Sequence, residues 1–392
     1  MLYTLVDWQR RLLDPWLNGL RLTAELPPLQ RLLMAQHTLL ERTLGAGDGV
    51  PVPIEAAVAR DHPGVSSAET VDEGPFSRLV RLRGARGKAS SPAPTILVVA
   101  PYSGYAGAVL GELAAALLPV GDLYFLDWTD ARFVPTAFGA FGLTEQLALV
   151  LGAMRQIDRP VHLLGVSQSG AATLAAAALA SASVDSLKRP ASLALLGTPI
   201  GVAHTRSAAD WLLAGLEPGH LESSMISVVP DRFPGAGRRV YPGMLQLLAL
   251  CLANPTTYLE TQAGLWAELI SDREGHYTRQ HGDLHRVADV PAELFIEQVH
   301  QLLREPVLSP DGLMIGGRQI PKGGLVQLPI LTVEAGRDEL VGAGATHAAQ
   351  VLGGPGSSPM TVETASHYTL FAGAFLATEV APRLRAFIEE AA

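Results

Sequence analysis

The sequence has little cysteine and no clustered positive charge. These two features limit the compartment and the classes of function that fit the protein. Cys251 is the one cysteine among 392 residues, so no disulfide can form within the chain, which fits a reducing compartment. Lysine and arginine number 29 against 38 aspartates and glutamates, and no basic stripe runs along any segment. Nucleic-acid binding needs clustered positive charge, so the sequence argues against that class of function.

Long hydrophobic runs are also missing. No unbroken apolar stretch reaches the roughly 18 residues at which a membrane-spanning helix is predicted. The longest candidate, residues 93–120, contains prolines, glycines and a glutamate, and it reads as strand, turn and helix. Near the N-terminus, Asp7, Arg10 and Arg11 interrupt the apolar residues before a signal-peptide core can form. We therefore expect a cytoplasmic protein without a membrane span.

The first 75 residues are expected to form a helical extension. Leucine and tryptophan recur at helical spacing through about the first 45 residues, which predicts a helical cap on the main domain or, alternatively, a helix that docks on a partner or surface. Residues 46–74 are rich in Gly, Pro, Asp and Glu, and this composition predicts an irregular connection.

Strand and helix patterns then alternate, which predicts an α/β fold with a mostly parallel central sheet. The predicted strands cover 76–82, 96–100, 122–128, 161–166, 192–198, 329–335 and 360–365. Predicted helices follow at about 107–118, at 143–157, from Gly170 onward and over the last 20 or so residues. A hydrophobic fraction of 48% is enough to bury a large core.

The alternation stops between residues 199 and 327. Within this segment, 244–270 is mostly helical in pattern and unusually apolar. We therefore expect a core of 76–198 and 328–392, of the α/β-hydrolase type, with a helical cap (lid) inserted over 199–327. The apolar helix is a candidate for contact with an apolar substrate.

A nucleophile is predicted where the strand 161–166 meets the next helix. Gly165-Val166-Ser167-Gln168-Ser169-Gly170 resembles the G-x-S-x-G elbow, in which a sharp turn exposes the serine hydroxyl. Small residues are needed on either side of the serine because strand and helix crowd there. Ser169 replaces the usual second glycine but is still small. The alternative is a strand–turn–helix junction that contains serine by chance.

A serine nucleophile needs a base and an acid, and both follow in the order that this fold requires. Asp338 comes three residues after the strand 329–335, and His367 comes in the loop after the last strand. Glu334 lies within its strand, and Glu339 is one position further along than Asp338. Both are therefore weaker candidates for the acid of the triad. The alternative role for Asp338 is a helix N-cap, and the two roles are compatible.

Backbone N–H groups should stabilise the oxyanion that forms when the serine attacks. One is expected from Gln168, directly after the nucleophile. The other is expected from the turn after the strand 96–100, where Pro101 has no N–H, so Tyr102 is the first choice and Ser103 the second. Simple chain reversal is the alternative for this turn.

No cofactor or metal is predicted. His281 and His285 could be read as metal ligands, but no companion ligands are evident, and a polar loop is the better interpretation. Cys251 lies in an apolar helical segment and is interpreted as a buried packing residue.

Several segments together resemble the intracellular polyhydroxybutyrate depolymerases, and the resemblance covers nearly the whole chain. They are MLYTLVDWQRRLLDP, VVAPYSGYAG, LYFLDWTDARFVPTAFGAFG, VVPDRFPGAGRRVYPG, VEAGRDELVG and SHYTLF. The resemblance implies an enzyme that hydrolyses the cell's own amorphous polyester granules, and a location in the cytoplasm or at the granule. Many members of that family carry cysteine where this chain has Ser167. Either the chain represents a serine-using branch, or a cysteine has been replaced.

The preferred interpretation is a serine esterase that cleaves poly(3-hydroxybutyrate) through an acyl-enzyme, with Ser167, Asp338 and His367 as its triad. The first alternative is a carboxylesterase that acts on soluble hydroxyacid oligomers or short-chain esters. A synthase-like acyltransferase and a non-catalytic granule-coating protein are further alternatives. The oligomeric state is left open, with a homodimer as one option.

Overall fold

The computed structural model describes residues 52–61, 65–84, 93–182, 187–205, 207, 218–253, 255–271, 287–303, 306–309 and 312–391. Most of the predicted N-terminal extension, residues 1–51, lies outside this set. The prediction of a helical extension is therefore not tested over those residues.

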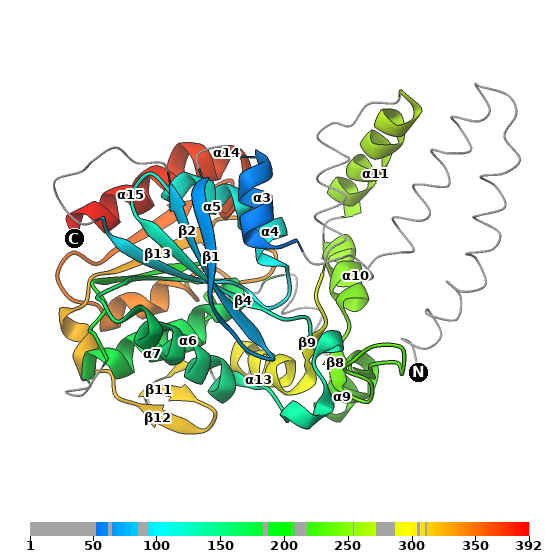
Figure 1. The fold of residues 1–392 in the computed structure, drawn as a ribbon, viewed down its shortest axis with the longest axis horizontal. Helices are drawn as coiled ribbons and strands as arrows, with labels where there is room; N and C mark the ends of the chain where they lie inside the picture. Colours follow the sequence, from blue (N-terminus) through cyan, green and yellow to red (C-terminus); the bar gives the residue numbers. More distant parts are fainter. Residues whose placement is uncertain are drawn as a thin grey trace, which may run out of the picture.

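An eight-stranded sheet forms the centre of the molecule (Figure 1), with the strand order β1-β2-β4-β3-β5-β6-β13-β14. Its strands are β1 (Val65–Glu73), β2 (Ser77–Gly84), β3 (Thr95–Val99), β4 (Asp122–Trp128), β5 (His162–Val166), β6 (Ser192–Leu196), β13 (Ile330–Ala335) and β14 (Ser358–Val362). The pairs β1–β2 and β2–β4 are antiparallel, and all other neighbouring strands of this sheet are parallel. The prediction of an α/β-hydrolase fold with a mostly parallel sheet is confirmed.

The central strands form because their sequences are apolar on both sides. β3, β5, β6 and β13 are buried at every residue, as expected for parallel strands covered by helices on both faces. One face is covered by α5 (Gly111–Leu117), α14 (Gly373–Phe375) and α15 (Ala381–Glu390), and the other by α6 (Leu143–Ile157) and α7 (Gly170–Ala182) (Figure 1). α7 is rich in alanine, so its backbone can approach the sheet closely.

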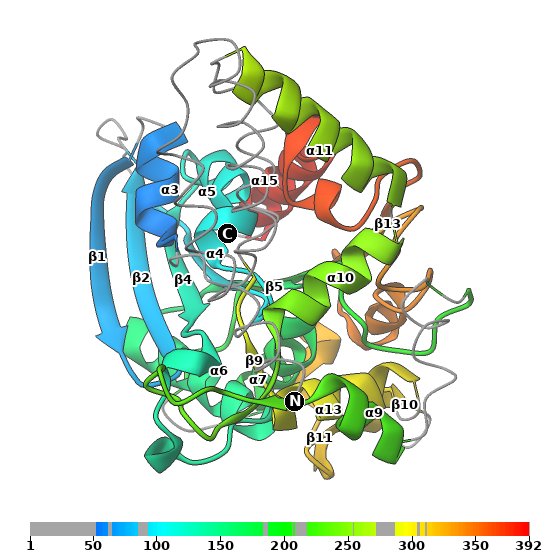
Figure 2. The same cartoon turned by 90° about the vertical axis from the view of Figure 1, so that its right-hand side faces the viewer.

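The expectation of an irregular connection over 46–74 is wrong for two stretches. Residues Ile54–Asp61 form α3, which packs on α4 (Ala106–Val109) and α5, and residues Val65–Glu73 form β1. Figure 2 shows β1 at the outer edge of the sheet. Most of its residues are exposed, so its formation depends on backbone pairing with β2 rather than on an apolar pattern.

The segment between β6 and β13 is mixed rather than helical. It contains the helices α9 (Pro218–Met225), α10 (Gly243–Ala253), α11 (Pro255–Ile270) and α13 (Ala292–Leu303). It also contains two three-stranded sheets, β7 (Ser227–Val228) with β8 (Arg239–Tyr241) and β9 (Val290–Pro291), and β10 (Leu308–Ser309) with β11 (Gly312–Ile315) and β12 (Arg318–Ile320). Strands of two to four residues carry too little periodicity to be read from sequence.

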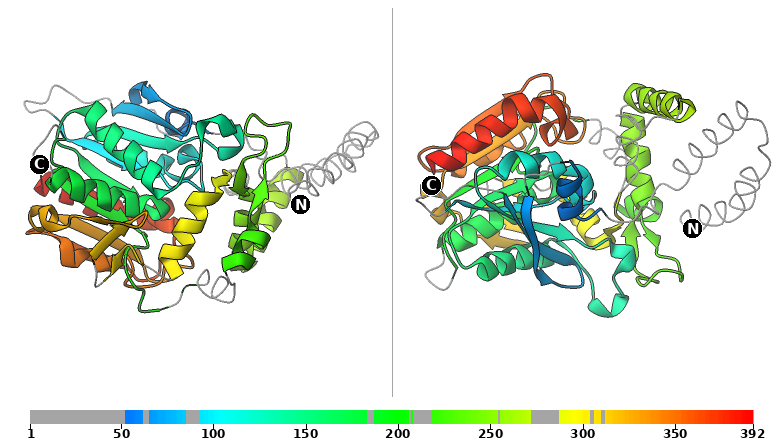
Figure 3. Two further views of the ribbon diagram at one scale, coloured as in Figure 1. Left: turned by 90° about the horizontal axis from the view of Figure 1, so that it is seen from below. Right: turned by 45° about the horizontal axis from the view of Figure 1, so that its top comes forward.

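Part of this segment packs on the core, and part stands beside it. α13 contacts α6, and β11 and β12 contact α7, so these elements belong to the body of the domain. α10 and α11 stand out from the α/β core (Figures 1 and 3). Only the latter pair resembles the separate cap that the sequence predicts.

Two of the segments that carry the family resemblance pack against each other. Asp130 accepts hydrogen bonds from the Arg132 guanidinium at 2.7 and 2.9 Å, and both side chains are buried. From the second segment, Arg238 donates to the carbonyls of Val134, Pro135 and Gly139 at 2.7 to 2.8 Å. The charged residues of these two motifs therefore anchor loops near the carboxyl ends of the strands.

Candidate active site

Ser167 lies on the sharp turn that the sequence predicts. β5 ends at Val166, a single 3₁₀ turn covers Ser167–Ser169, and α7 begins at Gly170. Ser167 has φ of 50°, one of two positive φ values among the non-glycine residues that the structure describes. A non-glycine residue in this region stores of order 1–3 kcal/mol of strain. The serine is only 9% exposed.

The turn is crowded at Gly165, as the sequence predicts, and also at Gly170, which the sequence pattern did not single out. A Cβ on Gly165 would lie 3.0 Å from Thr173 Cβ, which is tight, and one on Gly170 would lie 2.3 Å from Thr198 Cβ, which is not permitted. Glycine is therefore required three positions after Ser167. The position two after it holds Ser169, whose side chain is fully buried.

The hydroxyl of Ser169 makes hydrogen bonds that the usual glycine could not make. Its Oγ accepts a hydrogen bond from the Val166 N–H at 2.9 Å. Its proton can go to the Val99 carbonyl at 2.7 Å or to the Val166 carbonyl at 2.9 Å, and the shorter distance favours Val99. Ser169 thus links the ends of β3 and β5 beneath the nucleophile.

The structure brings Ser167, His367 and Asp338 together in one line of hydrogen bonds. His367 Nε2 lies 2.9 Å from Ser167 Oγ, and His367 Nδ1 lies 2.8 Å from Asp338 Oδ2. The residues follow β5, β13 and β14, whose carboxyl ends meet at one edge of the sheet. The imidazole is completely buried. The arrangement allows a proton to pass from the serine hydroxyl to a ring whose other nitrogen is bound to a carboxylate.

Backbone contacts fix the acid and the base relative to each other. Asp338 Oδ1 accepts the N–H groups of Leu340 at 2.9 Å and Val341 at 2.8 Å, so the carboxylate also caps its own turn. The Arg337 N–H donates to the Ala365 carbonyl at 3.0 Å, which joins the two loops. The capping role and the histidine contact of Asp338 therefore coexist.

Two carboxylates act on the protonation of His367. Burial lowers the pKa of His367, but the charge and hydrogen bond of Asp338 and the charge of Glu339 outweigh it, so the pKa is raised above its usual value. Glu339 does not touch the ring. Its carboxylate accepts the backbone N–H of His367 at 3.1 Å.

Three contacts that the sequence did not reveal hold the imidazole. Phe371 and Tyr368 lie edge-on to it, with ring centroids 5.3 and 5.4 Å away. On another side lies Gly197, directly after β6, where φ is 55°. The sequence pattern places Gly197 within the predicted strand 192–198. Its role becomes visible only from its position next to His367.

The turn after β3 is held against the elbow. The Ser103 N–H donates to the side-chain Oε1 of Gln168 at 3.0 Å, and the Tyr102 hydroxyl donates to the Thr129 carbonyl at 2.7 Å. From α13, the Gln298 side chain donates to the Gln168 carbonyl at 3.3 Å. Gln168 is in the first turn of a helix, where N–H groups lack intrahelical partners.

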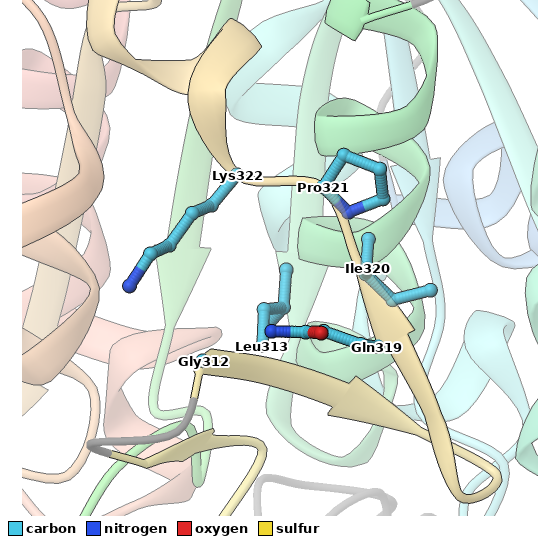
Figure 4. A pocket seen from close by; sticks show the side chains of 6 residues that line it. All are labelled: Gly312, Leu313, Gln319, Ile320, Pro321 and Lys322. Atoms are coloured by element: carbon cyan, nitrogen blue, oxygen red, sulfur yellow. The ribbon is translucent and has the colours of Figure 1, made fainter.

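The other predicted or rejected residues lie apart from this line. Glu334 accepts the N–H groups of Gly344, Thr346 and His347, each at 2.8 Å, and so shapes a loop. Cys251 is half-buried on α10 rather than buried. His281 and His285 lie outside the described residues. Figure 4 shows a pocket of about 200 Å³ beside the β11–β12 hairpin, and its lining includes none of the three aligned residues.

Comparison with known families places the chain. A sequence model described as "PHB de-polymerase C-terminus" matches residues 197–392, half of the chain, which include Asp338 and His367. The chain belongs to this family. Membership supports the broad statement that the protein is an ester hydrolase. A comparison with curated protein sequences gave no match.

Several solved structures match the chain at low sequence identity and with TM-scores below 0.5. A membrane phospholipase A described as a bacterial virulence factor is 16% identical, with a TM-score of 0.45 over 100% of this chain and 99% of that one. A putative lipase from Acinetobacter baumannii AYE is 13% identical, with a TM-score of 0.46 over 88% and 99%. A putative lipase from Sulfolobus solfataricus is 13% identical, with a TM-score of 0.47 over 82% and 93%.

One further prediction concerns membranes. Within the ranges that the structure describes, no helix combines the length and apolar character needed to cross a bilayer.

Proposed function

We propose that this protein is a serine hydrolase that cleaves the ester bonds of poly(3-hydroxybutyrate) to oligomers or 3-hydroxybutyrate through an acyl-enzyme. The observation that carries the proposal is the hydrogen-bonded line from Ser167 through His367 to Asp338 in a member of this family. No cofactor is needed for this chemistry, because the nucleophile, base and acid are all side chains.

Each of the three residues has a defined step. Neutral His367 takes the proton of Ser167 through Nε2 as Oγ attacks the ester carbonyl carbon. The tetrahedral intermediate collapses, and His367 gives the proton to the departing alkoxide oxygen. Water, activated by the same imidazole, then releases the hydroxyacid and restores Ser167. Asp338 keeps the Nδ1–H tautomer and stabilises the imidazolium.

The oxyanion is proposed to bind the backbone N–H groups of Gln168 and Tyr102. Ser103 was the alternative to Tyr102, but its N–H already donates to the Gln168 side chain, which favours Tyr102. Removing one donor of this kind from a serine hydrolase costs about 3–4 kcal/mol of transition-state stabilisation.

The polymer itself is proposed to contact α10 and α11. Three leucines on these helices are exposed: Leu248 by 53%, Leu252 by 63% and Leu259 by 66%. An apolar polyester surface would bury such side chains, and a granule in the cytoplasm is the proposed location of the substrate. The residues on the protein side are apolar and need no charged partner.

A carboxylesterase acting on soluble hydroxyacid esters is the second candidate. The 9% exposure of Ser167 favours it, because a small ester reaches a covered serine more easily than a polymer chain does. An acyltransferase is disfavoured because its polymerising relatives use a thiolate. A granule-coating protein without activity is disfavoured because all three positions are filled.

The test is the release of 3-hydroxybutyrate and oligomers from amorphous polyhydroxybutyrate granules by this chain, Ser167→Ala and Ser167→Cys. Release by the parent alone supports a serine depolymerase. Release only by the cysteine variant means that the serine stands in place of a functional cysteine. If all three leave granules intact while the parent still cleaves p-nitrophenyl butyrate, the second candidate replaces the first.

A further inference from the structure

The end of β3 and the loop that follows it are joined to the nucleophile turn at two points, one on either side of Tyr102. Before it, the Ser169 hydroxyl lies 2.7 Å from the Val99 carbonyl. After it, the Ser103 N–H lies 3.0 Å from Gln168 Oε1. The two side chains come from consecutive residues directly after Ser167.

Other contacts hold the same loop to different parts of the domain. Trp128 Nε1 donates to the Ala100 carbonyl at 2.6 Å, and the Tyr102 hydroxyl bonds to the Thr129 carbonyl at 2.7 Å. Both contacts tie the loop to β4 and the turn after it. Neither contact reaches the nucleophile turn. The side chains of Gln168 and Ser169 bridge to it directly, beside the backbone pairing of Val99 with Gly165.

We infer that Gln168 and Ser169 are positioning residues that set the two oxyanion N–H groups at a fixed separation. The inference rests on the proposed function, because it assigns both side chains to the same acyl transfer. The Gln168 residue then acts twice: its N–H faces the oxyanion, and its side chain orients the loop that carries Tyr102. Neither side chain needs to touch the substrate.

The inference gives a reason for serine at position 169. Glycine there would leave the Val166 N–H without its acceptor and the Val99 carbonyl without this donor. Both groups are buried, and an unpaired buried backbone group is destabilising. Serine satisfies both within a volume that the turn accommodates, and it couples β3 to the elbow.

The test compares Ser169→Ala and Gln168→Met with the matched controls Ser357→Ala and Gln350→Met. Ser357 Oγ also accepts a backbone N–H, from Ile330, and donates to a carbonyl, of Gly354. Gln350 donates to carbonyls of β13 and β14. We expect kcat to fall about ten- to a hundredfold in both elbow variants with KM changed less than about threefold. The controls should lower Tm without this loss of kcat.

Two measurements separate positioning from simple destabilisation. Affinity for phenylboronic acid, which forms a tetrahedral adduct on the serine, should fall in parallel with kcat in the elbow variants alone. Hydrogen exchange of the Ser103 amide should accelerate at least about tenfold in Gln168→Met, because its acceptor is gone.

The outcomes distinguish the two proposals. If Ser167→Ala abolishes ester cleavage but both elbow variants keep kcat within about twofold of the parent, the positioning role is wrong and the hydrolase stands. If the parent cleaves no ester, the proposed function fails, and unchanged Ser103 exchange in Gln168→Met would overturn the tether as well. Falls in kcat and boronate affinity with faster exchange support both.

Discussion

Gly197 lies against the imidazole of His367, so closely that a methyl group in place of its hydrogen would be 3.1 Å from Cε1 and 3.3 Å from Nδ1. These distances are shorter than ordinary van der Waals contact. The glycine also has φ of 55°, which an L side chain disfavours. The space that the base occupies therefore depends on Gly197, which lies directly after β6 and far from His367 in sequence.

Gly197→Ala should lower both stability and activity. We expect a loss of about 1–3 kcal/mol in unfolding free energy from backbone strain and a drop in kcat of at least about tenfold, because the ring must move away from Ser167. The control is Gly317→Ala, where φ is 72° and nothing lies within 4 Å of the added methyl. It should lose similar stability and keep kcat. Equal activities of the two variants would contradict this role.

The raised pKa of His367 predicts the acid limb of the rate profile. Because only neutral imidazole accepts the serine proton, kcat/KM should fall as pH drops through a value above the usual 6.5 or so. Asp338→Asn should shift this limb to lower pH and reduce kcat by about 10⁴-fold. Glu339→Gln should shift it less, because that carboxylate meets the backbone N–H rather than the ring.

The same pKa fixes how stability depends on pH at this site. A histidine whose folded pKa exceeds its unfolded pKa contributes stability that is fully present below the unfolded value and is lost as pH rises through the folded value. The His367–Asp338 pair should therefore stabilise the fold most where the enzyme is least active. Unfolding of the parent and Asp338→Asn across pH 5–9 (about the range in which histidine titrates) measures this. If the unfolding free energies of the two proteins depend on pH in the same way, the predicted contribution of the His367–Asp338 pair is wrong.

Gly170 and Thr198 should be energetically coupled. Gly170→Ala places a Cβ about 2.3 Å from the Thr198 side chain and should abolish activity and lower Tm. Thr198→Gly removes all three obstructing atoms, Cβ, Cγ2 and Oγ1, and its backbone bonds to Thr346 do not depend on the side chain. In the double variant we expect at least about 1 kcal/mol of the lost stability to return. Strict additivity of the two substitutions, measured by urea unfolding, would exclude the contact.

Polar substitution on α10 and α11 should separate polymer from small-ester activity. Leu248→Ser with Leu252→Ser and Leu259→Ser should weaken granule binding, since each buried leucine contributes up to about 1.5–3 kcal/mol. Cleavage of p-nitrophenyl butyrate should be unchanged. Val351→Ser is the control, because Val351 is 81% exposed but lies on the α/β core. If granule and small-ester activities fall together, the helices serve stability.

The sequence predicted the core strands well because each is a short apolar run between turn signals. β4 matches its predicted range of 122–128. β5 and β13 differ from theirs by one residue at one end, and β3 is shifted by one residue at both ends. The three aligned residues were also predictable, since each lies in the turn or loop after such a strand and the fold fixes their order. Their meeting within hydrogen-bond distance follows from the parallel sheet.

What the sequence could not predict depends on contacts between distant segments. β1 has few apolar residues and exists through pairing with β2, so its pattern resembles a loop. The place of Gly197 against His367 requires knowing that β6 lies beside β13. The role of the Ser169 hydroxyl requires the position of Val99 on β3, which no spacing within the elbow reveals.

The small sheet β7-β8-β9 closes the base of the excursion that carries α10 and α11. Tyr241 pairs with Val290 and Val240 with Pro291, so the chain leaves the domain and returns to it at one place. Lengthening such a closed loop has a small entropic effect, and its ends need not move. Val287 and Ala288 contact Gly104 and Ser103, so they must stay. The residues between Gly243 and Val287 can be exchanged to suit a solid granule or a dissolved ester, and the geometry around the serine is left as it is.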